Sequence, residues 1–137
     1  MALTSGEISA GTIAYLDHEL VLADPDIQQV NSSLDRDGPI LCVQREPGVS
    51  VWTTITKVER VERLLLEQRW KLHGSPGWQA DRQFLCDGLN TYIAKHASFV
   101  RAGANARPFS GYRRPRLHRD GVAAVLQAIK KRGGQLI

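Results

Sequence analysis

The chain has few of the residues that build metal, redox and nucleotide-hydrolysing sites. Its two cysteines, Cys42 and Cys86, each lie in an apolar stretch, which predicts reduced thiols in the core. Neither a Cys-x-x-Cys pair nor a His-x-x-x-His pair occurs, so we expect no metal site and no cofactor. Gly-rich phosphate loops and a Gly-x-Ser-x-Gly elbow are also absent, which argues against the common nucleotide hydrolases and serine hydrolases.

Long hydrophobic runs are missing as well. No apolar stretch approaches the roughly 20 residues of a membrane span, and the N-terminus lacks the basic-then-apolar order of a signal peptide. A length of 137 residues with 42% hydrophobic residues is typical of one domain with a real core. We therefore predict a cytoplasmic protein without membrane contact, with a flexible N-terminus at residues 1–10 and a single domain at residues 11–137.

Acidic residues are scarce in the last third of the chain. Residues 101–137 hold nine Lys or Arg and one acid, Asp120, whereas residues 1–100 hold nine bases and thirteen acids. A basic segment of charge +8 on a body of charge −4 indicates a polyanionic partner, most often nucleic acid.

Aromatic residues accompany part of this positive charge. Arg107, Arg113 and Arg114 lie close to Phe109 and Tyr112, a mixture typical of single-stranded nucleic-acid binding. We predict that the three arginines contact RNA phosphates. The alternative is a solvated basic surface that only keeps the protein in solution.

The clearest structural unit is a β-hairpin. Residues 39–44 and 49–56 are two β-rich runs joined by the turn Arg45-Glu46-Pro47-Gly48. The first run is apolar on both faces, which predicts a central strand. Before it, residues 11–22 are predicted to form one bent strand or two short ones, and residues 23–38 a long surface loop.

Two later segments fit either a helix or a strand. Residues 57–72 and 81–100 each have apolar residues at both helical and alternating spacing. An apolar stripe that ends before Gly133 predicts a C-terminal amphipathic helix at about residues 118–132. The predicted fold class is mostly β with this C-terminal helix. The alternative is an α+β fold with three helices, in which both ambiguous segments are helical.

Five short motifs follow one another between residues 11 and 132. They are Gly11-Thr12-Ile13, Gly38-Pro39-Ile40-Leu41-Cys42-Val43, Thr53-Thr54-Ile55-Thr56-Lys57, Phe84-Leu85-Cys86-Asp87-Gly88-Leu89-Asn90-Thr91, and the helix after Leu117-His118. In this order they resemble the MazF/PemK toxin family, small barrels of the Src-homology-3-like type that cleave RNA without metal. The resemblance implies such a barrel, with strands in the ambiguous segments. It also implies a metal-independent endoribonuclease toxin that cuts single-stranded RNA.

The resemblance assigns the catalytic roles to a loop and to the end of a strand. The family's catalytic arginine directly precedes the proline, where this chain has Gly38, and Arg36 lies two residues earlier in the same loop. The family's catalytic threonine or serine maps best onto Thr56, with Thr54 and Thr53 as alternatives. An arginine suits the charge that develops at phosphorus, because its planar, permanently charged fork gives paired donors to phosphate oxygens. A threonine hydroxyl suits the positioning of the scissile phosphate.

Four further residues are candidates for RNA binding. Trp52 shares a strand face with Thr54 and Thr56, and its ring is predicted to stack on an unpaired base. Asn90 lies where the family-like strand lines the substrate groove, so its amide is predicted to hydrogen-bond to a base. Lys57 and Lys95 are included as further RNA contacts.

Histidines supply an alternative acid–base chemistry. His18 lies beside Asp17 and Glu19, and His96 lies beside Lys95, and an imidazole at either place is a candidate general acid or base near neutral pH. Neither histidine is preferred over Arg36 and Thr56 as a catalytic residue.

The resemblance also implies partners. Family members form homodimers that a disordered acidic antitoxin segment wraps, and the basic C-terminal third fits that segment as well as it fits RNA. A different interpretation of the chain is a non-catalytic barrel module that binds nucleic acid or a protein. Gly38 at the position of the family's arginine favours that second interpretation.

Overall fold

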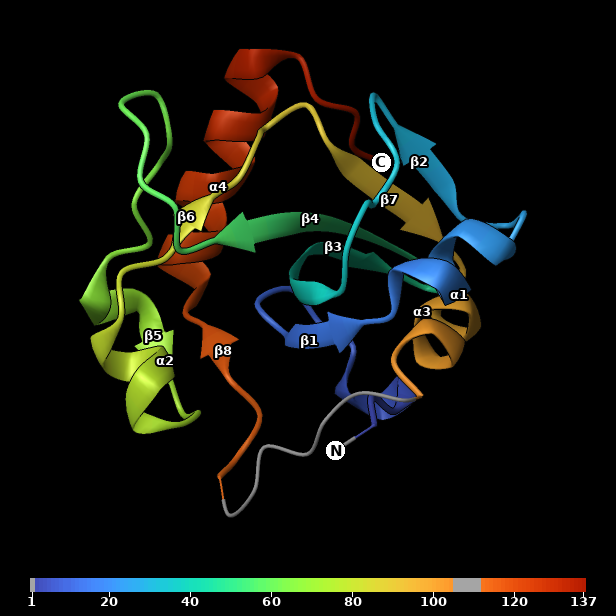
Figure 1. The fold of residues 1–137 in the computed structure, drawn as a ribbon, viewed down its shortest axis with the longest axis horizontal. Helices are drawn as coiled ribbons and strands as arrows, with labels where there is room; N and C mark the ends of the chain where they lie inside the picture. The colour runs from blue at the N-terminus through green and yellow to red at the C-terminus, as the bar shows by residue number, and fades with distance from the viewer. Residues whose placement is uncertain (1, 105–111) are drawn as a thin grey trace.

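One six-stranded antiparallel sheet organises the chain in the computed structural model, which describes residues 2–104 and 112–137 (Figure 1). Its strands are β1 (Ile13–Leu16), β2 (Gln28–Val30), β3 (Gly38–Glu46), β4 (Val49–Thr56), β6 (Phe84–Leu85) and β7 (Thr91–Ala94). The order across the sheet is β1-β3-β4-β7-β2, and β6 also pairs with β4. A separate antiparallel pair is made by β5 (Lys71–Leu72) and β8 (Arg116–Leu117).

Helices fill the connections and the C-terminus. They are α1 (His18–Ala23), α2 (Pro76–Ala80), α3 (His96–Ala102) and α4 (Arg119–Arg132), with 3-10 turns at Ser5–Glu7 and Gln68–Trp70. The prediction of a mostly antiparallel β protein with a C-terminal helix is confirmed. With four α-helices in the part of the chain that it describes, the structure is also a small α+β fold, as in the alternative, but helices do not cover both ambiguous segments. Residues 57–72 contain no α-helix, and residues 81–100 contain β6 and β7 before α3 begins. Within the described residues, the sheet ends at β1 and β2 without a pairing between them.

The predicted hairpin is confirmed as β3 and β4. Their pairing runs from Ile40 opposite Thr54 to Glu46 opposite Val49, with a bulge between Cys42 and Gln44. β3 lies between β1 and β4, as its apolar character on both faces predicted.

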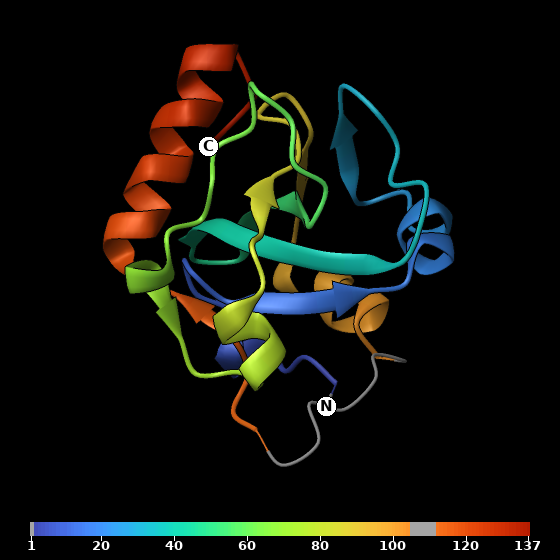
Figure 2. The ribbon, with the colours of Figure 1, turned by 60° about the vertical axis from the view of Figure 1, so that its left-hand side comes forward.

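Each face of the sheet is covered by helices. Figure 2 shows α4 on one side of the strands and α1 on the other. Leu41, Val51 and Ile55 pack with the buried residues of α4, whereas Cys42, Trp52 and Tyr92 pack with α1 and α3. Alternate residues of β3 and β4 therefore enter two different cores, as the period of two in a strand requires.

The segment after β1 corrects the prediction for residues 11–22. β1 is followed by a helix rather than by a second strand. The Oδ1 atom of Asp17 accepts hydrogen bonds from the backbone N–H groups of Glu19 (2.9 Å) and Leu20 (3.4 Å). An aspartate in this position satisfies amide groups that the first turn of a helix leaves unpaired, and so favours the helix start.

The N-terminal residues 2–10 are packed, so the prediction of a flexible N-terminus is wrong. Leu3 and Ile8 are only 2% and 3% exposed and belong to the core under α1 and α3. Thr4 and Glu7 form a capping box around the 3-10 turn. These apolar anchors offset the conformational entropy that fixing a chain end costs.

Arg114 is a structural residue, which corrects its assignment as an RNA contact. Its side chain is buried, and its Nε atom donates to Oε2 of Glu7 at 2.8 Å. Its terminal nitrogens donate to the carbonyl oxygens of Ala2 and Ile13. Arg116 similarly donates to Ser9, Thr12 and Ala10. Part of the basic C-terminal third therefore holds the N-terminal segment in place.

The C-terminal helix is confirmed as α4. His118 caps its start by accepting a hydrogen bond from the Asp120 amide, and Gly133 ends it in the left-handed conformation at φ 84°. None of the helices within residues 2–104 and 112–137 combines the length and apolar character that a transmembrane helix needs.

Candidate active site

At its C-terminal end, strand β4 exchanges one pairing partner for another. β7 pairs with residues 50–53 of β4, and β6 pairs with Ile55 and Thr56. Residues 86–90 connect the two neighbours and pass the edge of β4 at Thr54. A cavity of about 550 Å³ lies over this end of the strand, and we call it the central cavity.

The central cavity brings together five residues that the sequence singled out. They are Arg36, Thr54, Thr56, Lys57 and Asn90. The first comes from the loop before β3, the next three from the end of β4 and the last from the turn before β7. Residues up to 54 positions apart in the sequence thus line one cavity.

The threonines differ in how far their hydroxyls are engaged. Thr56 is 8% exposed, and its Oγ1 accepts a hydrogen bond from the Val58 amide at 3.1 Å, so it keeps a hydrogen to donate. Thr54 is half-buried, and its side chain makes no hydrogen bond with another described residue. Thr53 does not qualify as an alternative, because it is fully buried and donates to the carbonyl oxygen of Asn90.

Asn90 ties the loop that carries Arg36 to the sheet. Its Oδ1 atom accepts hydrogen bonds from Nδ2 of Asn31 and from Oγ of Ser32, each at 2.8 Å. Leu34, in the middle of the same loop, is buried in the core under α1. The Asn90 oxygen is therefore engaged within the protein, and the predicted contact with a base is left to its Nδ2 group.

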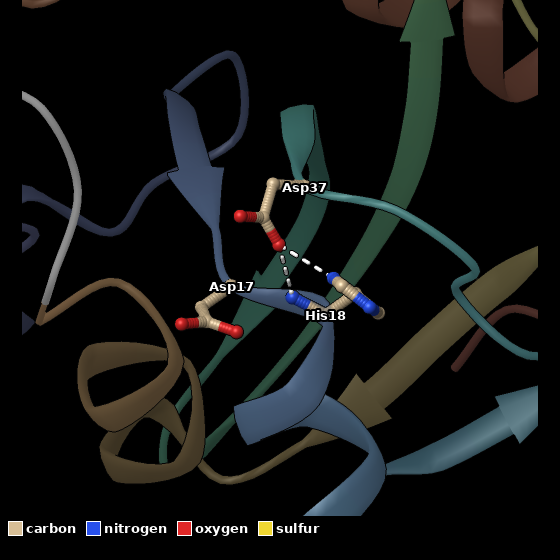
Figure 3. Close-up of side chains that lie close together, drawn as sticks. All are labelled: Asp17, His18 and Asp37. Atoms are coloured by element: carbon tan, nitrogen blue, oxygen red, sulfur yellow. Dashed lines mark hydrogen bonds and ion pairs between the residues drawn. The ribbon is translucent and has the colours of Figure 1, made fainter.

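The other end of this loop is held by an ion pair with α1. The backbone N–H of His18 donates to Oδ1 of Asp37 at 2.9 Å, and the ring atom Nδ1 of His18 lies 2.6 Å from the same oxygen (Figure 3). A carboxylate oxygen of Asp17 lies within 4.8 Å of the paired atoms of His18 and Asp37. The Oδ1 atom of Asp17, however, caps the start of α1. Asp37 also lines the central cavity, so the pair connects α1 to the cavity wall.

The His18–Asp37 pair makes this anchor sensitive to pH. The hydrogen bond to Asp37 raises the pKa of His18 above its ordinary value of 6.5, and the same bond lowers the pKa of Asp37 below 3.8. Asp17 and Glu19 add smaller effects in the same direction on His18. The stabilisation from His18 is fully present below pH 6.5 and is lost as pH rises through its raised pKa, whereas that from Asp37 is lost as pH falls through its lowered pKa.

We expect Asp37→Asn to lower the pKa of His18 towards its ordinary value of 6.5, because the substitution removes the negative charge that favours the imidazolium ion. The measurement is an NMR titration of the His18 ring protons in wild type and in Asp37→Asn. A midpoint for His18 that is equal in the two proteins would contradict the ion pair.

Arg36 itself is exposed at the cavity wall. It makes no hydrogen bond or ion pair with any other residue in the described ranges. Lys57, which also lines the cavity, forms an ion pair with Asp81 at 2.9 Å. Arg36 is therefore the cation of this cavity that is available to an incoming anion.

Trp52 is wrong as a base-stacking residue. Its ring is fully buried and packs against Phe99 of α3 with ring centroids 5.3 Å apart. Its Nε1 atom donates to Oγ of Ser50 at 2.9 Å. Trp52 shares the strand face of Thr54 and Thr56, but α3 covers that face at Trp52.

The remaining predicted RNA contacts lie away from the central cavity or outside the described residues. Lys95 is exposed at the start of α3, and Arg113 is exposed beside a different hollow near the N-terminal segment. Arg107 lies outside the described residues. His96 is bound through Nε2 to the carbonyl oxygen of Glu46, at the turn end of the hairpin opposite the cavity.

Tyr15 and Asp37 line the central cavity but were not selected from the sequence. Asp17 was a signal for the start of α1, but no signal in the sequence placed His18 beside Asp37. Tyr92 also lines the cavity, and burial raises its pKa to about 12, so its phenol remains a hydrogen-bond donor at neutral pH.

The central cavity brings together the Arg36 guanidinium, the hydroxyls of Thr54 and Thr56 and the phenols of Tyr15 and Tyr92. This set of donors suits a phosphodiester group. Comparison of the chain with protein-family models, with curated proteins and with solved structures finds no match. The geometry of the cavity is the basis of the functional assignment below.

Proposed function

We propose that the chain is a metal-independent endoribonuclease of the MazF/PemK type that cuts single-stranded RNA. The observation that carries this proposal is the convergence of Arg36, Thr54, Thr56, Lys57 and Asn90 on one cavity. The small-barrel architecture of that family is part of the proposal. It is supported by the order of an N-terminal strand, the β3–β4 hairpin, a later strand and a final helix, although α1 and β2 lie between the first strand and the hairpin.

The reaction needs no group from outside the protein and RNA. The ribose O2′ loses its proton and attacks the adjacent phosphorus, the bond from phosphorus to O5′ breaks, and O5′ takes up a proton. The products are a 2′,3′-cyclic phosphate and a free 5′-hydroxyl. Arg36 donates to the non-bridging oxygens, where negative charge accumulates, and the Thr56 hydroxyl fixes the same phosphate.

A second candidate function is a binding module without catalysis. Gly38, at the position of the family's arginine, is the observation that favours it. Both candidates use the same cavity and the same RNA, and they differ in whether the phosphodiester is broken.

The test is cleavage of a long single-stranded RNA by the purified protein in EDTA. We expect discrete fragments that end in cyclic phosphate. Thr56→Val should slow the cleavage about tenfold, since one hydrogen bond to a charged group is lost, while Thr56→Ser should retain most of the rate. Intact RNA after incubation with folded protein would reject the enzyme and favour the binding module.

The proposal extends to partners and location. We propose a cytoplasmic homodimer that an acidic antitoxin segment neutralises. Arg119, Lys130 and Lys131 are exposed on α4 and support a contact with an acidic segment. Arg114 and Arg116 are excluded from that contact surface, because they are engaged with the N-terminal segment.

A further inference from the structure

A second, smaller cavity adjoins the central cavity. Its volume is about 190 Å³, and we call it the aromatic cavity. The two cavities share five lining residues, namely Tyr15, Pro39, Ile55, Thr56 and Lys57. A ligand bound at Thr56 therefore has both cavities within reach.

Two aromatic residues and two prolines are among the residues that line the aromatic cavity. Trp78 forms one side, and Tyr15, which is 42% exposed, stands at the border with the central cavity. Trp78 is held by two contacts: its amide donates to Oγ of Ser75 at 3.2 Å, and the Lys71 ammonium lies 5.1 Å from its ring centroid. Fixed aromatic and proline surfaces of this kind suit a planar heteroaromatic ring.

Gln83 supplies an oriented polar group to this cavity. Gln83 lines the cavity and is only 5% exposed. The Lys71 ammonium donates to its Oε1 atom and also to the carbonyl oxygen of Asp81. Because an ammonium group only donates, this contact fixes which end of the Gln83 amide is oxygen.

Two residues that line this cavity have a donor without a partner in the described part of the chain. The Nε1 group of Trp78 is buried and makes no hydrogen bond with a described residue, and the Nε2 group of Gln83 makes none with another described residue. A buried donor without a partner is costly unless water or a ligand supplies an acceptor. The contact with Lys71 orients the Gln83 donor.

We propose that the aromatic cavity binds the base of a nucleotide next to the scissile phosphate, with the Gln83 amide donating to that base. This inference rests on the proposed ribonuclease function. A keto oxygen, as on uracil or guanine, accepts this hydrogen bond, whereas an amino group at the same edge, as on cytosine or adenine, repels it. Gln83 is then a specificity-determining residue.

The experiment uses 2′-O-methyl RNA trinucleotides, which cannot be cleaved because the attacking hydroxyl is blocked. Four trinucleotides differ only in one base, and their dissociation constants are measured by NMR titration. The Trp78 indole signal is identified with Trp78→Phe, and the Gln83 side-chain amide signal with Gln83→Glu. We expect a uracil or guanine oligomer to bind about tenfold more tightly than its cytosine or adenine counterpart and to shift both signals.

A matched pair of variants separates base reading from net charge. Gln83→Glu replaces the donor by an acceptor and should abolish the preference for keto bases. Gln127→Glu makes the same chemical change on the exposed face of α4, outside both cavities, and should keep the preference. If Gln83→Glu does not fold, the base preference of wild type and the shift of the Trp78 signal decide the case.

The assignment would be overturned by equal affinity for all four bases. It would also be overturned by a base preference that does not shift the NMR signals of Trp78 and Gln83. The absence of any binding would overturn it as well. Cleavage of unmodified RNA is measured separately. Base-selective binding without cleavage would support the base site and reject the ribonuclease function. Cleavage without any shift of the Trp78 and Gln83 signals would support the ribonuclease function and reject the base site.

Discussion

Arg36→Ala is expected to lower kcat/KM for RNA cleavage by about 10²–10³-fold, the size of effect seen when one fixed donor to a developing oxyanion is removed. The physical reason is that Arg36 is the cation of the central cavity without a partner among the described residues. Its loop is held by Asn90 at one end and by His18 at the other, so little ordering is needed when substrate binds. Initial rates on a short RNA with one cleavage site measure the effect.

Two further substitutions separate charge, geometry and folding. Arg36→Lys keeps the charge but loses the planar fork, and we expect a rate between those of wild type and Arg36→Ala. Arg45→Ala removes an exposed arginine at the opposite end of β3, outside the central cavity, and should leave the rate unchanged. Equal losses from Arg36→Ala and Arg45→Ala would show a general charge effect and contradict the catalytic role.

Gly38 allows a direct test of the missing family arginine. A Cβ atom built on Gly38 meets no atom within 4 Å, and its φ is not in the left-handed region, so the backbone accepts a side chain there. We expect Gly38→Arg to restore much of the activity of Arg36→Ala, because both side chains start from the wall of the same cavity. Failure of this double variant to regain activity, with its fold intact, would mean that the position of Arg36 itself is required.

Local patterns were sufficient to predict the hairpin and the last helix. The run from Pro39 is apolar on both faces, and the run from Val49 alternates, so each strand's place follows from which faces are buried. α4 has its stripe of Val122, Val125 and Ile129 and its terminal Gly133, all within one stretch of sequence. Such features depend on neighbours in the chain and not on distant contacts.

The errors arose where a distant segment decides the environment of a residue. Trp52 looks available on its strand, and only the packing of α3 against it makes it a core residue. Arg114 lies in a basic stretch, and Glu7, 107 positions away, turns it into a structural residue. Sequence periodicity reports the face on which a side chain lies, but not which element covers that face.

The candidate site shows the same division. The motif order predicted Arg36, Thr56 and Asn90 as site residues, and the structure places them around one cavity. The fixation of the loop by His18 and Asp37 depends on a contact across 19 positions that no local pattern contains. The same holds for the Lys71–Gln83 contact, which orients a donor through two segments on either side of α2.

Trp52→Ala is expected to destabilise the protein by about 3–5 kcal/mol, the usual cost of removing a large buried aromatic side chain. Trp52 is fully buried in the core under α1 and α3, and the change also removes its contact with Phe99 and its hydrogen bond to Ser50. Urea denaturation followed by circular dichroism measures the free energy of unfolding. A loss below about 1 kcal/mol, typical of a surface substitution, would contradict the buried position.

Trp52→Phe distinguishes a core role from base stacking. It keeps an aromatic ring in the core but removes the hydrogen bond to Ser50, so we expect a loss of about 2 kcal/mol in stability. RNA cleavage, assayed well below the unfolding temperature, should proceed at the wild-type rate, because Trp52 does not line the central cavity. A tenfold fall in the cleavage rate with unchanged stability would instead indicate that Trp52 contacts the RNA. In that case α3 would have to move away from the sheet when RNA binds.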